Sequence, residues 1–254
     1  MTKLFASDFD GTLHFWDKPD PLIAPHDMDA IAAFRKAGGL FGVCTGRALK
    51  SLTAQTQGHL DFDFYITISG AALFDTNCQL IWQRTLPKDV LREIYERYAA
   101  QLAPKEFQVV VAADDYWVLG DTQTSFPIAR LESFDEVPGP YSGFSIETVT
   151  EEAASAYAAD INERYGDVVA AHQNLNSVDV VPAGCTKGSG LVHIVEHYGA
   201  ALSAGIGDSY NDLPLLEAAD VAYTFNRAAQ DVRTEADVLV DHASEAIYDF
   251  MERA

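Results

Sequence analysis

The sequence predicts an α/β protein in which a doubly wound parallel sheet is interrupted by a smaller α+β domain. Short apolar runs alternate with helical patterns in the first third of the chain, and the same alternation returns in the last quarter. The middle has a different pattern, with two long amphipathic helices and short alternating segments. Regular strand–helix alternation is typical of a parallel sheet with helices on both faces.

The N-terminal part is expected to supply three strands and two helices. Three apolar runs have the length of buried strands: 3–9, 40–45 and 63–69. Two segments between them have helical patterns: 25–39 and 47–58. The first of these helices begins at Pro25, which favours the first helical turn, and ends at Gly38, a frequent helix stop.

The C-terminal part continues the alternation. Helices are expected at 186–199 and 210–219, and strands at 203–207 and 220–225. Two further short helices are expected at the end of the chain: 227–235 and 243–253.

The middle of the chain is predicted to form a domain with its own core. Helices at 87–102 and 150–165 each carry an apolar face. The expected faces are Leu91, Ile94, Tyr95, Tyr98 and Leu102 in the first helix, and Ala154, Tyr157, Ala158, Ile161 and Tyr165 in the second. The segments 106–120 and 167–182 alternate like antiparallel strands. We therefore expect an inserted α+β domain at 83–183 and a doubly wound domain from 1–82 and 184–254.

Charge and cysteine content limit the partners. The net charge of −21 argues against nucleic acid and against an anionic membrane surface, because both repel a polyanion. Three cysteines (Cys44, Cys78 and Cys185) cannot all pair, which favours a reducing compartment. The first ten residues are too acidic for a signal peptide, and no apolar run reaches the length of about 18 residues typical of a membrane span. A cytoplasmic location is expected.

Polar residues follow several of the predicted strands. Asp8 and Asp10 end the first, Thr45, Gly46 and Arg47 follow the second, and Asp208 ends the strand at 203–207. Lys187 opens the helix just after the insert. In an open parallel sheet, ligands bind outside the carboxyl ends of the strands. The sequence therefore predicts one site built from four separate segments.

Each of these residues also has a purely structural interpretation. Asp10-Gly11 is a common hairpin turn, and Asp208 and Thr45 could cap the helices that follow them. Lys187 and Arg47 could be exposed side chains. The convergence of four segments favours the chemical interpretation, although both interpretations stay open for Arg47 and Thr45 can fill both roles at once.

Four motifs carry a resemblance to a known family. The segments "DFDGTL", "TGR", "CTKG" and "GDSYND" resemble, in order, the signature motifs of the haloacid dehalogenase (HAD) superfamily of phosphatases. The segment "SGAALFD" and the large insert resemble its Cof-type branch, whose α+β cap of the second type follows the third strand. The resemblance implies a Rossmann-like core with an inserted cap that selects the substrate.

The resemblance also implies the chemistry. Asp8 would be the nucleophile and Asp10 the general acid/base. The two residues are two positions apart, so on an extended strand end their side chains would face the same side. A carboxylate that attacks phosphorus forms an aspartyl-phosphate, which divides one difficult displacement into two easier ones. A second carboxyl can protonate the leaving alcohol and then deprotonate the attacking water.

Further roles follow from the same resemblance. Mg²⁺ would be held by the Asp8 carboxylate, the Asp10 backbone carbonyl and Asp208, and Asp212 would orient waters around it. Gly11 allows a close backbone approach to the phosphate, and Lys187 offsets the charge that develops on it. The remaining expected phosphate-binding residues are Thr45, which is also counted as catalytic, Gly46, Arg47 and Asn211.

The expected function is a Mg²⁺-dependent phosphatase acting on small organic phosphomonoesters, such as sugar phosphates. Two alternatives are a sugar phosphomutase of the same superfamily and a non-catalytic ligand-binding protein. One departure is Ser69, which stands where the Cof-type branch often has Asn. The sequence does not indicate the oligomeric state, the physiological substrate or the cap residues that set specificity.

Overall fold

The computed structural model of the chain describes residues 2–17, 21–120, 122, 124 and 128–253. Its contacts divide the chain into two compact units. The first unit contains Met1–Gly46, Gln55–Trp82 and Thr186–Ala254. The second contains Arg47–Ala54 and Gln83–Cys185.

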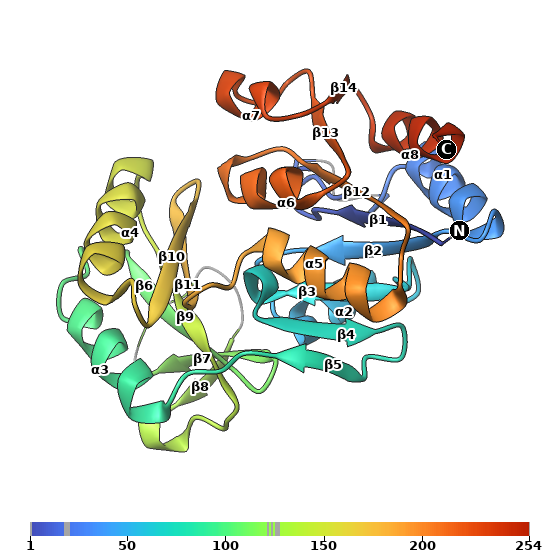
Figure 1. The fold of residues 1–254 in the computed structure, drawn as a ribbon. Helices are drawn as coiled ribbons and strands as arrows, with labels where there is room; N and C mark the ends of the chain where they lie inside the picture. The colour runs from blue at the N-terminus through green and yellow to red at the C-terminus, as the bar shows by residue number, and fades with distance from the viewer. Residues whose placement is uncertain (1, 18–20, 121, 123, 125–127, 254) are drawn as a thin grey trace. The chain divides into compact units, whose positions relative to one another are not determined.

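The first unit is built on an eight-stranded sheet with the order β14-β13-β12-β1-β2-β3-β4-β5 (Figure 1). Six strands run parallel: β1 (Lys3–Ser7), β2 (Leu40–Cys44), β3 (Phe64–Thr67), β12 (Leu202–Gly207), β13 (Val221–Phe225) and β14 (Val238–Val240). Two further strands follow β3: β4 (Ala72–Asp75), which is antiparallel to β3, and β5 (Leu80–Gln83), which forms the edge of the sheet. The predicted fold class, a doubly wound α/β core, is confirmed.

Six helices alternate with these strands in the sequence: α1 (Pro25–Lys36), α2 (Leu49–Thr56), α5 (Lys187–Tyr198), α6 (Leu213–Ala218), α7 (Gln230–Thr234) and α8 (Ala243–Glu252). Helix α1 packs against α8, and α5 packs against α6. Strand β1 contributes side chains to both pairs, because successive side chains of a strand point to opposite faces.

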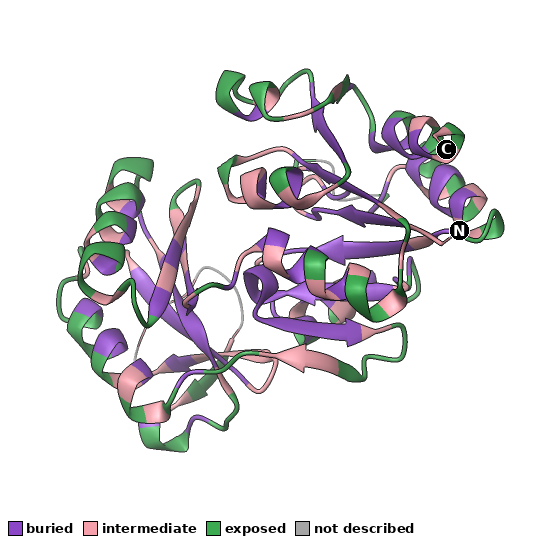
Figure 2. Cartoon of the chain, viewed as in Figure 1, coloured by how far each residue is buried: buried purple, intermediate pink, exposed green. Residues whose placement is uncertain are grey.

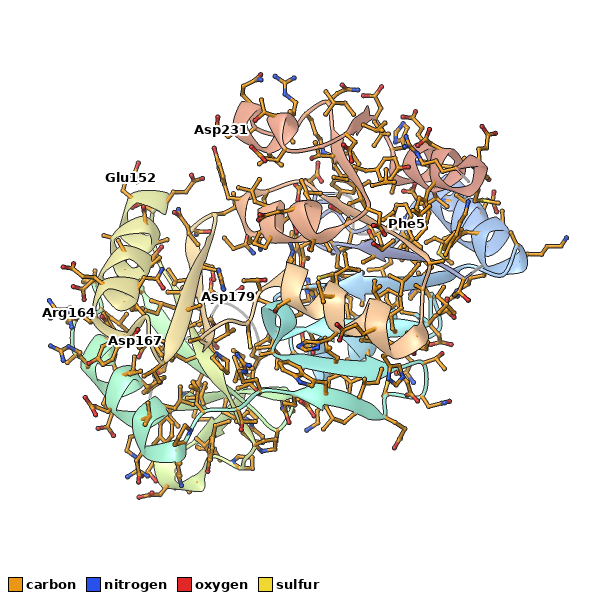
Figure 3. All side chains as sticks on the ribbon, viewed as in Figure 1. Phe5, Glu152, Arg164, Asp167, Asp179 and Asp231 are labelled. Carbon is orange, nitrogen blue, oxygen red and sulfur yellow. The ribbon has the colours of Figure 1, made fainter. Side chains whose placement is uncertain are left out.

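The two faces of β1 are both buried (Figure 2). Leu4 and Ala6 belong to an apolar cluster with side chains of α5 and α6: Leu191, Ile194 and Leu215. Phe5, labelled in Figure 3, points the other way and contacts rings of α1, β2, β13 and α8: Phe34, Phe41, Tyr223 and Phe250. A sheet that is covered on both faces leaves its strand ends as the natural place for polar side chains.

The second unit has a six-stranded sheet with the order β10-β11-β9-β6-β7-β8. Its strands are β6 (Phe107–Ala112), β7 (Asp115–Leu119), β8 (Ala129–Leu131), β9 (Tyr141–Glu147), β10 (Val169–Asn174) and β11 (Ser177–Pro182). Helices α3 (Lys88–Ala99) and α4 (Glu151–Tyr165) bury the apolar faces expected from the sequence in a common core, where Leu102, Tyr157 and Tyr165 are only partly buried.

Most of α2 is part of the second unit, where the β6–β7 hairpin satisfies the first backbone groups of the helix. The N–H of Lys50 donates to the Asp114 carbonyl at 3.1 Å, and the N–H of Ala48 donates to the Tyr116 hydroxyl at 2.9 Å. The first N–H groups of a helix have no partner within the helix, so such contacts replace a cap. The limits of 83–183 for the insert stay a prediction.

Several elements depart from the sequence expectations. Strands β4, β5 and β14 were not expected, and the strand at 63–69 ends at Thr67 because Ile68–Gly70 forms a 3₁₀ turn. Ile68 and Ser69 have φ values of 51° and 49°, which a strand cannot contain. The helix expected at 210–219 is divided into a 3₁₀ turn (Tyr210–Asp212) and α6.

The turn after β3 allows a test of close packing. Gly70 has a φ of +90°, and a Cβ there would collide with the backbone carbonyl of Thr186, directly before α5. Gly38 has the same φ of +90°, with nothing within 4 Å of a built Cβ. We expect Gly70→Ala to lower the free energy of unfolding by about 2 kcal/mol more than Gly38→Ala, measured by urea denaturation. Equal losses would mean that backbone strain alone matters at both positions.

In the parts of the chain that the structure describes, no helix combines the length and the apolar character needed to cross a lipid bilayer. The three cysteines form no disulfide; Cys44 and Cys185 are buried, and Cys78 is exposed.

Candidate active site

The carboxyl end of β1 lies between the ends of β12 and β2. Ser7 pairs with Ile206 on one side and with Val43 on the other, and the Asp8 N–H donates to the Ile206 carbonyl at 2.9 Å. The residues that follow these three strands are therefore neighbours at one edge of the sheet. Asp8, Thr45 and Asp208 are brought together in this way, although they are far apart in sequence.

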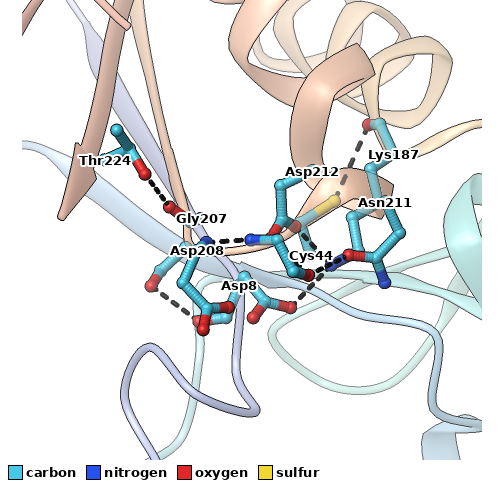
Figure 4. A network of polar contacts seen from close by, with 10 residues as sticks. Asp8, Cys44, Lys187, Gly207, Asp208, Asn211, Asp212 and Thr224 are labelled. Atoms are coloured by element: carbon cyan, nitrogen blue, oxygen red, sulfur yellow. Dashed lines mark hydrogen bonds and ion pairs between the residues drawn. The ribbon is translucent and has the colours of Figure 1, made fainter. Parts of the chain in front are cut away.

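A buried ion-pair network occupies this edge (Figure 4). The Lys187 ammonium donates to Asp8 Oδ1 at 2.6 Å and to Asp212 Oδ1 at 2.5 Å. The exposed fractions are 2% for Lys187, 5% for Asp8 and 0% for Asp212. Lys187 is therefore not a surface lysine, which was the structural alternative for this residue.

Local sequence explains why Lys187 is in this place. It is the first residue of α5, and Thr186 caps that helix in a capping box with Ser189. Each of the two side chains accepts a hydrogen bond from a backbone N–H group of the other residue. The cap determines where α5 begins and thereby directs Lys187 at the strand ends.

The network contains more carboxyl groups than ammonium groups. Burial lowers the pKa of Lys187, but the carboxylates of Asp212 and Asp8 outweigh it and raise the pKa well above its ordinary value. Burial, together with Asp212, raises the pKa of Asp208 to about 6. Among the described residues of this edge, three carboxylates thus lie beside the one ammonium group of Lys187.

Asp212 organises the loop that follows β12. Its Oδ2 accepts hydrogen bonds from the N–H groups of Asp208 at 3.0 Å and Ser209 at 3.1 Å, while its Oδ1 accepts from Lys187. Ser209 is the cap of the 3₁₀ turn at Tyr210–Asp212, so the alternative in which Asp208 serves as the helix cap is wrong. The Asp208 carboxylate, which is only partly buried, is free of that structural role.

The acidic cluster suits a hard divalent cation. One oxygen each from Asp8, Asp208 and Asp212 lie within 4.8 Å of one another. Mg²⁺ prefers oxygen ligands and is usually bound by one or two carboxylates together with substrate phosphates. The oxygen donors and the excess of carboxyl groups both fit such an ion.

The loop after β1 turns sharply at residues 11–13. The Phe9 carbonyl accepts hydrogen bonds from the N–H groups of Leu13 and His14, at 3.0 Å and 2.8 Å. Asp10 forms an isolated β-bridge with His14, directly before this turn. Gly11 has a φ of +82°, and a Cβ there would collide with the Asp208 carboxylate. Only glycine permits this approach of the turn to Asp208.

Thr45, which follows β2, forms backbone hydrogen bonds with β3 and with the turn after it. The Thr45 N–H donates to the Ile66 carbonyl at 2.8 Å, and the Thr45 carbonyl accepts from the Ser69 N–H at 3.0 Å. Thr45 is buried and Gly46 follows it in the first unit, whereas the contacts of Arg47 assign it to the second unit. Asn211 is partly buried, and its Oδ1 accepts from the Ser209 hydroxyl at 2.6 Å.

One residue at this edge was not considered in the sequence analysis. The Arg227 guanidinium donates to the Gly11 carbonyl at 2.5 Å and is attracted by the Asp208 carboxylate. It stands two residues after β13, so reading the residues beyond every strand end would have found it.

Comparison with known proteins now identifies the family. The model of the haloacid dehalogenase-like hydrolases matches residues 5–251, almost the whole chain. The chain belongs to this family. The expected superfamily and Cof-type branch, and with them a phosphatase as the class of enzyme, are confirmed.

Relatives and solved structures agree with this membership. The HMP-PP phosphatase of Escherichia fergusonii is 26% identical over 92% of this chain and 88% of its own length. A Streptococcus mutans structure matches with a TM-score of 0.85 at 14% identity, covering 100% of both chains. A HAD subclass IIB sugar phosphatase matches with a TM-score of 0.79 at 21% identity, covering 98% of this chain and 99% of its own. The two structural matches concern the fold.

Proposed function

We propose that this phosphatase hydrolyses small organic phosphomonoesters through an aspartyl-phosphate on Asp8 and requires Mg²⁺. The observation that carries the proposal is the buried Lys187 ammonium between Asp8 and Asp212, at a strand edge where carboxylates outnumber cations among the described residues. A site of this kind favours a divalent cation and the phosphate group that accompanies it.

Asp8 is the proposed nucleophile. Its Oδ1 accepts the hydrogen bond from Lys187, which leaves Oδ2 for attack on phosphorus. The Asp10 carboxyl group, two residues further along the chain, is proposed to donate a proton to the leaving alcohol. The resulting Asp10 carboxylate then removes a proton from the water that hydrolyses the aspartyl-phosphate.

The phosphoryl oxygens require donors while charge develops on them. Lys187 supplies a positive charge that is already held in position by two carboxylates, so little reorganisation is needed during the reaction. The other proposed donors are the Thr45 hydroxyl, the N–H groups of Gly11 and Gly46, and the side chains of Arg47 and Asn211.

Mg²⁺ would be held by the Asp8 carboxylate, the Asp10 backbone carbonyl and Asp208. When bound, the ion would remove the repulsion between an anionic nucleophile and an anionic phosphate. Both oxygens of Asp212 already accept hydrogen bonds, from Lys187 and from two backbone N–H groups. This arrangement supports an indirect role in which Asp212 orients water around the ion.

The second unit is proposed to act as a cap that excludes bulk water and recognises the leaving group. It has its own sheet and core, as a separately moving domain requires. Relatives named HMP-PP phosphatase and a structural neighbour named sugar phosphatase support small phosphorylated metabolites as substrates. A cytoplasmic location is part of the same proposal.

The test is phosphate release from a panel of sugar phosphates and HMP-PP, with Mg²⁺ and after removal of divalent ions by EDTA. We expect release that depends on Mg²⁺. We also expect Mg²⁺ alone to raise the melting temperature, because an ion that binds only the folded state stabilises it. Isomerisation of a sugar phosphate without phosphate release would instead indicate a phosphomutase. Release that is unaffected by EDTA would contradict the metal requirement.

A further inference from the structure

Arg227 connects the end of one strand to a loop two strands away. It follows β13, and its Nη2 donates to the carbonyl of Gly11 in the loop after β1, at 2.5 Å. The strand order at this point is β13-β12-β1. The side chain therefore extends past the end of β12, where Asp208 lies, to reach the loop.

Two aromatic rings hold the guanidinium. Its Cζ atom lies 3.6 Å from the centre of the Phe225 ring and 5.1 Å from that of the Phe15 ring. A cation at such distances from a ring face is attracted by its electron density. Phe225 is fully buried in β13, whereas Phe15 belongs to the same loop as Gly11. Arg227 thus contacts a fixed ring on the strand side and a second ring on the loop side.

Charge reinforces this geometry. The carboxylates of Asp208, Asp241 and Asp27 all attract the guanidinium, although its partial burial lowers the pKa of Arg227. An arginine remains protonated in proteins, so the attraction persists at neutral pH. In this strongly acidic chain, Arg227 is one of only 17 cationic side chains, and it lies beside the acidic strand edge.

Gly11 is consequently held from two directions. Its α-carbon lies so close to the Asp208 carboxylate that no side chain fits, and its carbonyl oxygen is bound by Arg227. Its N–H also donates to the His14 carbonyl at 2.8 Å within the loop. Any movement of Gly11 would move Asp10, because the two residues share a peptide group.

We propose that Arg227 is a positioning residue that holds the Asp10–Gly11 turn against the end of β12 in the geometry required for phosphoryl transfer. The effect of Arg227 on catalysis rests on the proposed function. Its effect on the position of the loop does not. Misplacement of a reacting group by about 1 Å can lower a rate about a hundredfold. A residue that only orients the loop can therefore have a large effect on turnover.

The test compares Arg227→Gln with Arg253→Gln. Arg253 is a matched control, because its guanidinium also lies over a ring of β13, that of Tyr223 at 5.8 Å, but pairs with Asp249. Amide hydrogen exchange is measured for residues 9–15 in both variants and the wild type. We expect faster exchange in this loop for Arg227→Gln only. Unchanged exchange would overturn the proposal, whether or not the wild type releases phosphate.

The catalytic part is tested by steady-state kinetics on the best substrate of the panel. We expect Arg227→Gln to lower kcat by about 10- to 100-fold with a smaller change in KM, and Arg253→Gln to retain wild-type kcat. Added guanidinium ion should restore part of the activity of Arg227→Gln. A wild-type kcat in a variant whose loop exchanges faster would overturn the positioning role. Absence of phosphate release in the wild type would instead count against the proposed function itself.

Discussion

Replacement of Asp8 by asparagine should abolish phosphate release while leaving the fold intact. An amide is not a nucleophile toward phosphorus, so we expect kcat of Asp8→Asn to fall by at least about a thousandfold. The amide side chain would keep an oxygen for the Lys187 ammonium, which now lies 2.6 Å from Asp8 Oδ1. The measurement is phosphate release under saturating substrate and Mg²⁺, with the wild type in parallel.

The same variant should not lose thermal stability. Burial and the neighbouring Asp212 raise the pKa of Asp8 well above its ordinary value, so the charged carboxyl is disfavoured in the folded protein without a metal. A neutral amide relieves this repulsion, and we expect an equal or higher melting temperature without Mg²⁺. Asp115→Asn is the control, because Asp115 forms a half-exposed pair with Lys50. Activity near that of the wild type in Asp8→Asn would rule out the aspartyl-phosphate mechanism.

Replacement of Lys187 by methionine should affect both stability and activity. Lys187→Met removes the ammonium that lies between two buried carboxylates, those of Asp8 and Asp212. Breaking a buried ion pair by removing one partner typically costs about 3–5 kcal/mol, and we expect a loss of this size in the free energy of unfolding. Turnover should also fall by at least about a hundredfold, because the transferring phosphoryl group loses a fixed cation.

Two further variants separate these effects. Lys50→Met breaks an ion pair with Asp115 in which the lysine side chain is 57% exposed, and it should cost less than about 1 kcal/mol. The double variant Lys187→Met/Asp212→Asn removes one of the two uncompensated charges and should recover part of the stability without recovering activity. Urea denaturation and phosphate release are measured for the wild type and all three variants. If Lys187→Met were as stable as Lys50→Met, the buried network would not contribute to stability.

Gly11, in the loop after β1, shows what a sequence motif can and cannot reveal. The resemblance implied that Gly11 approaches the phosphate closely, and the structure has Gly11 at a φ of +82° directly against the Asp208 carboxylate. The sequence did not indicate that Arg227 binds the Gly11 carbonyl from another strand end. That contact joins residues separated by 216 positions, and no local pattern records it.

Local patterns by themselves determined the alternation of strands and helices, the two amphipathic helices of the middle unit, and the strand ends that carry Asp8, Thr45 and Asp208. These features depend on side-chain periodicity, helix caps and turn residues, all of which act over a few positions. The sequence analysis did not expect β4 and β5, which have four residues each.

Only the tertiary structure decided which ion pairs and hydrogen bonds the polar residues of the site form. It buried Lys187 between two carboxylates, assigned the helix cap to Ser209 in place of Asp208, and used both oxygens of Asp212 within the protein. Burial, hydrogen bonds and neighbouring charges set the pKa of such groups, and all three arise from elements brought together by folding. The residue types of the site can therefore be found from sequence, whereas their electrostatic roles require the folded chain.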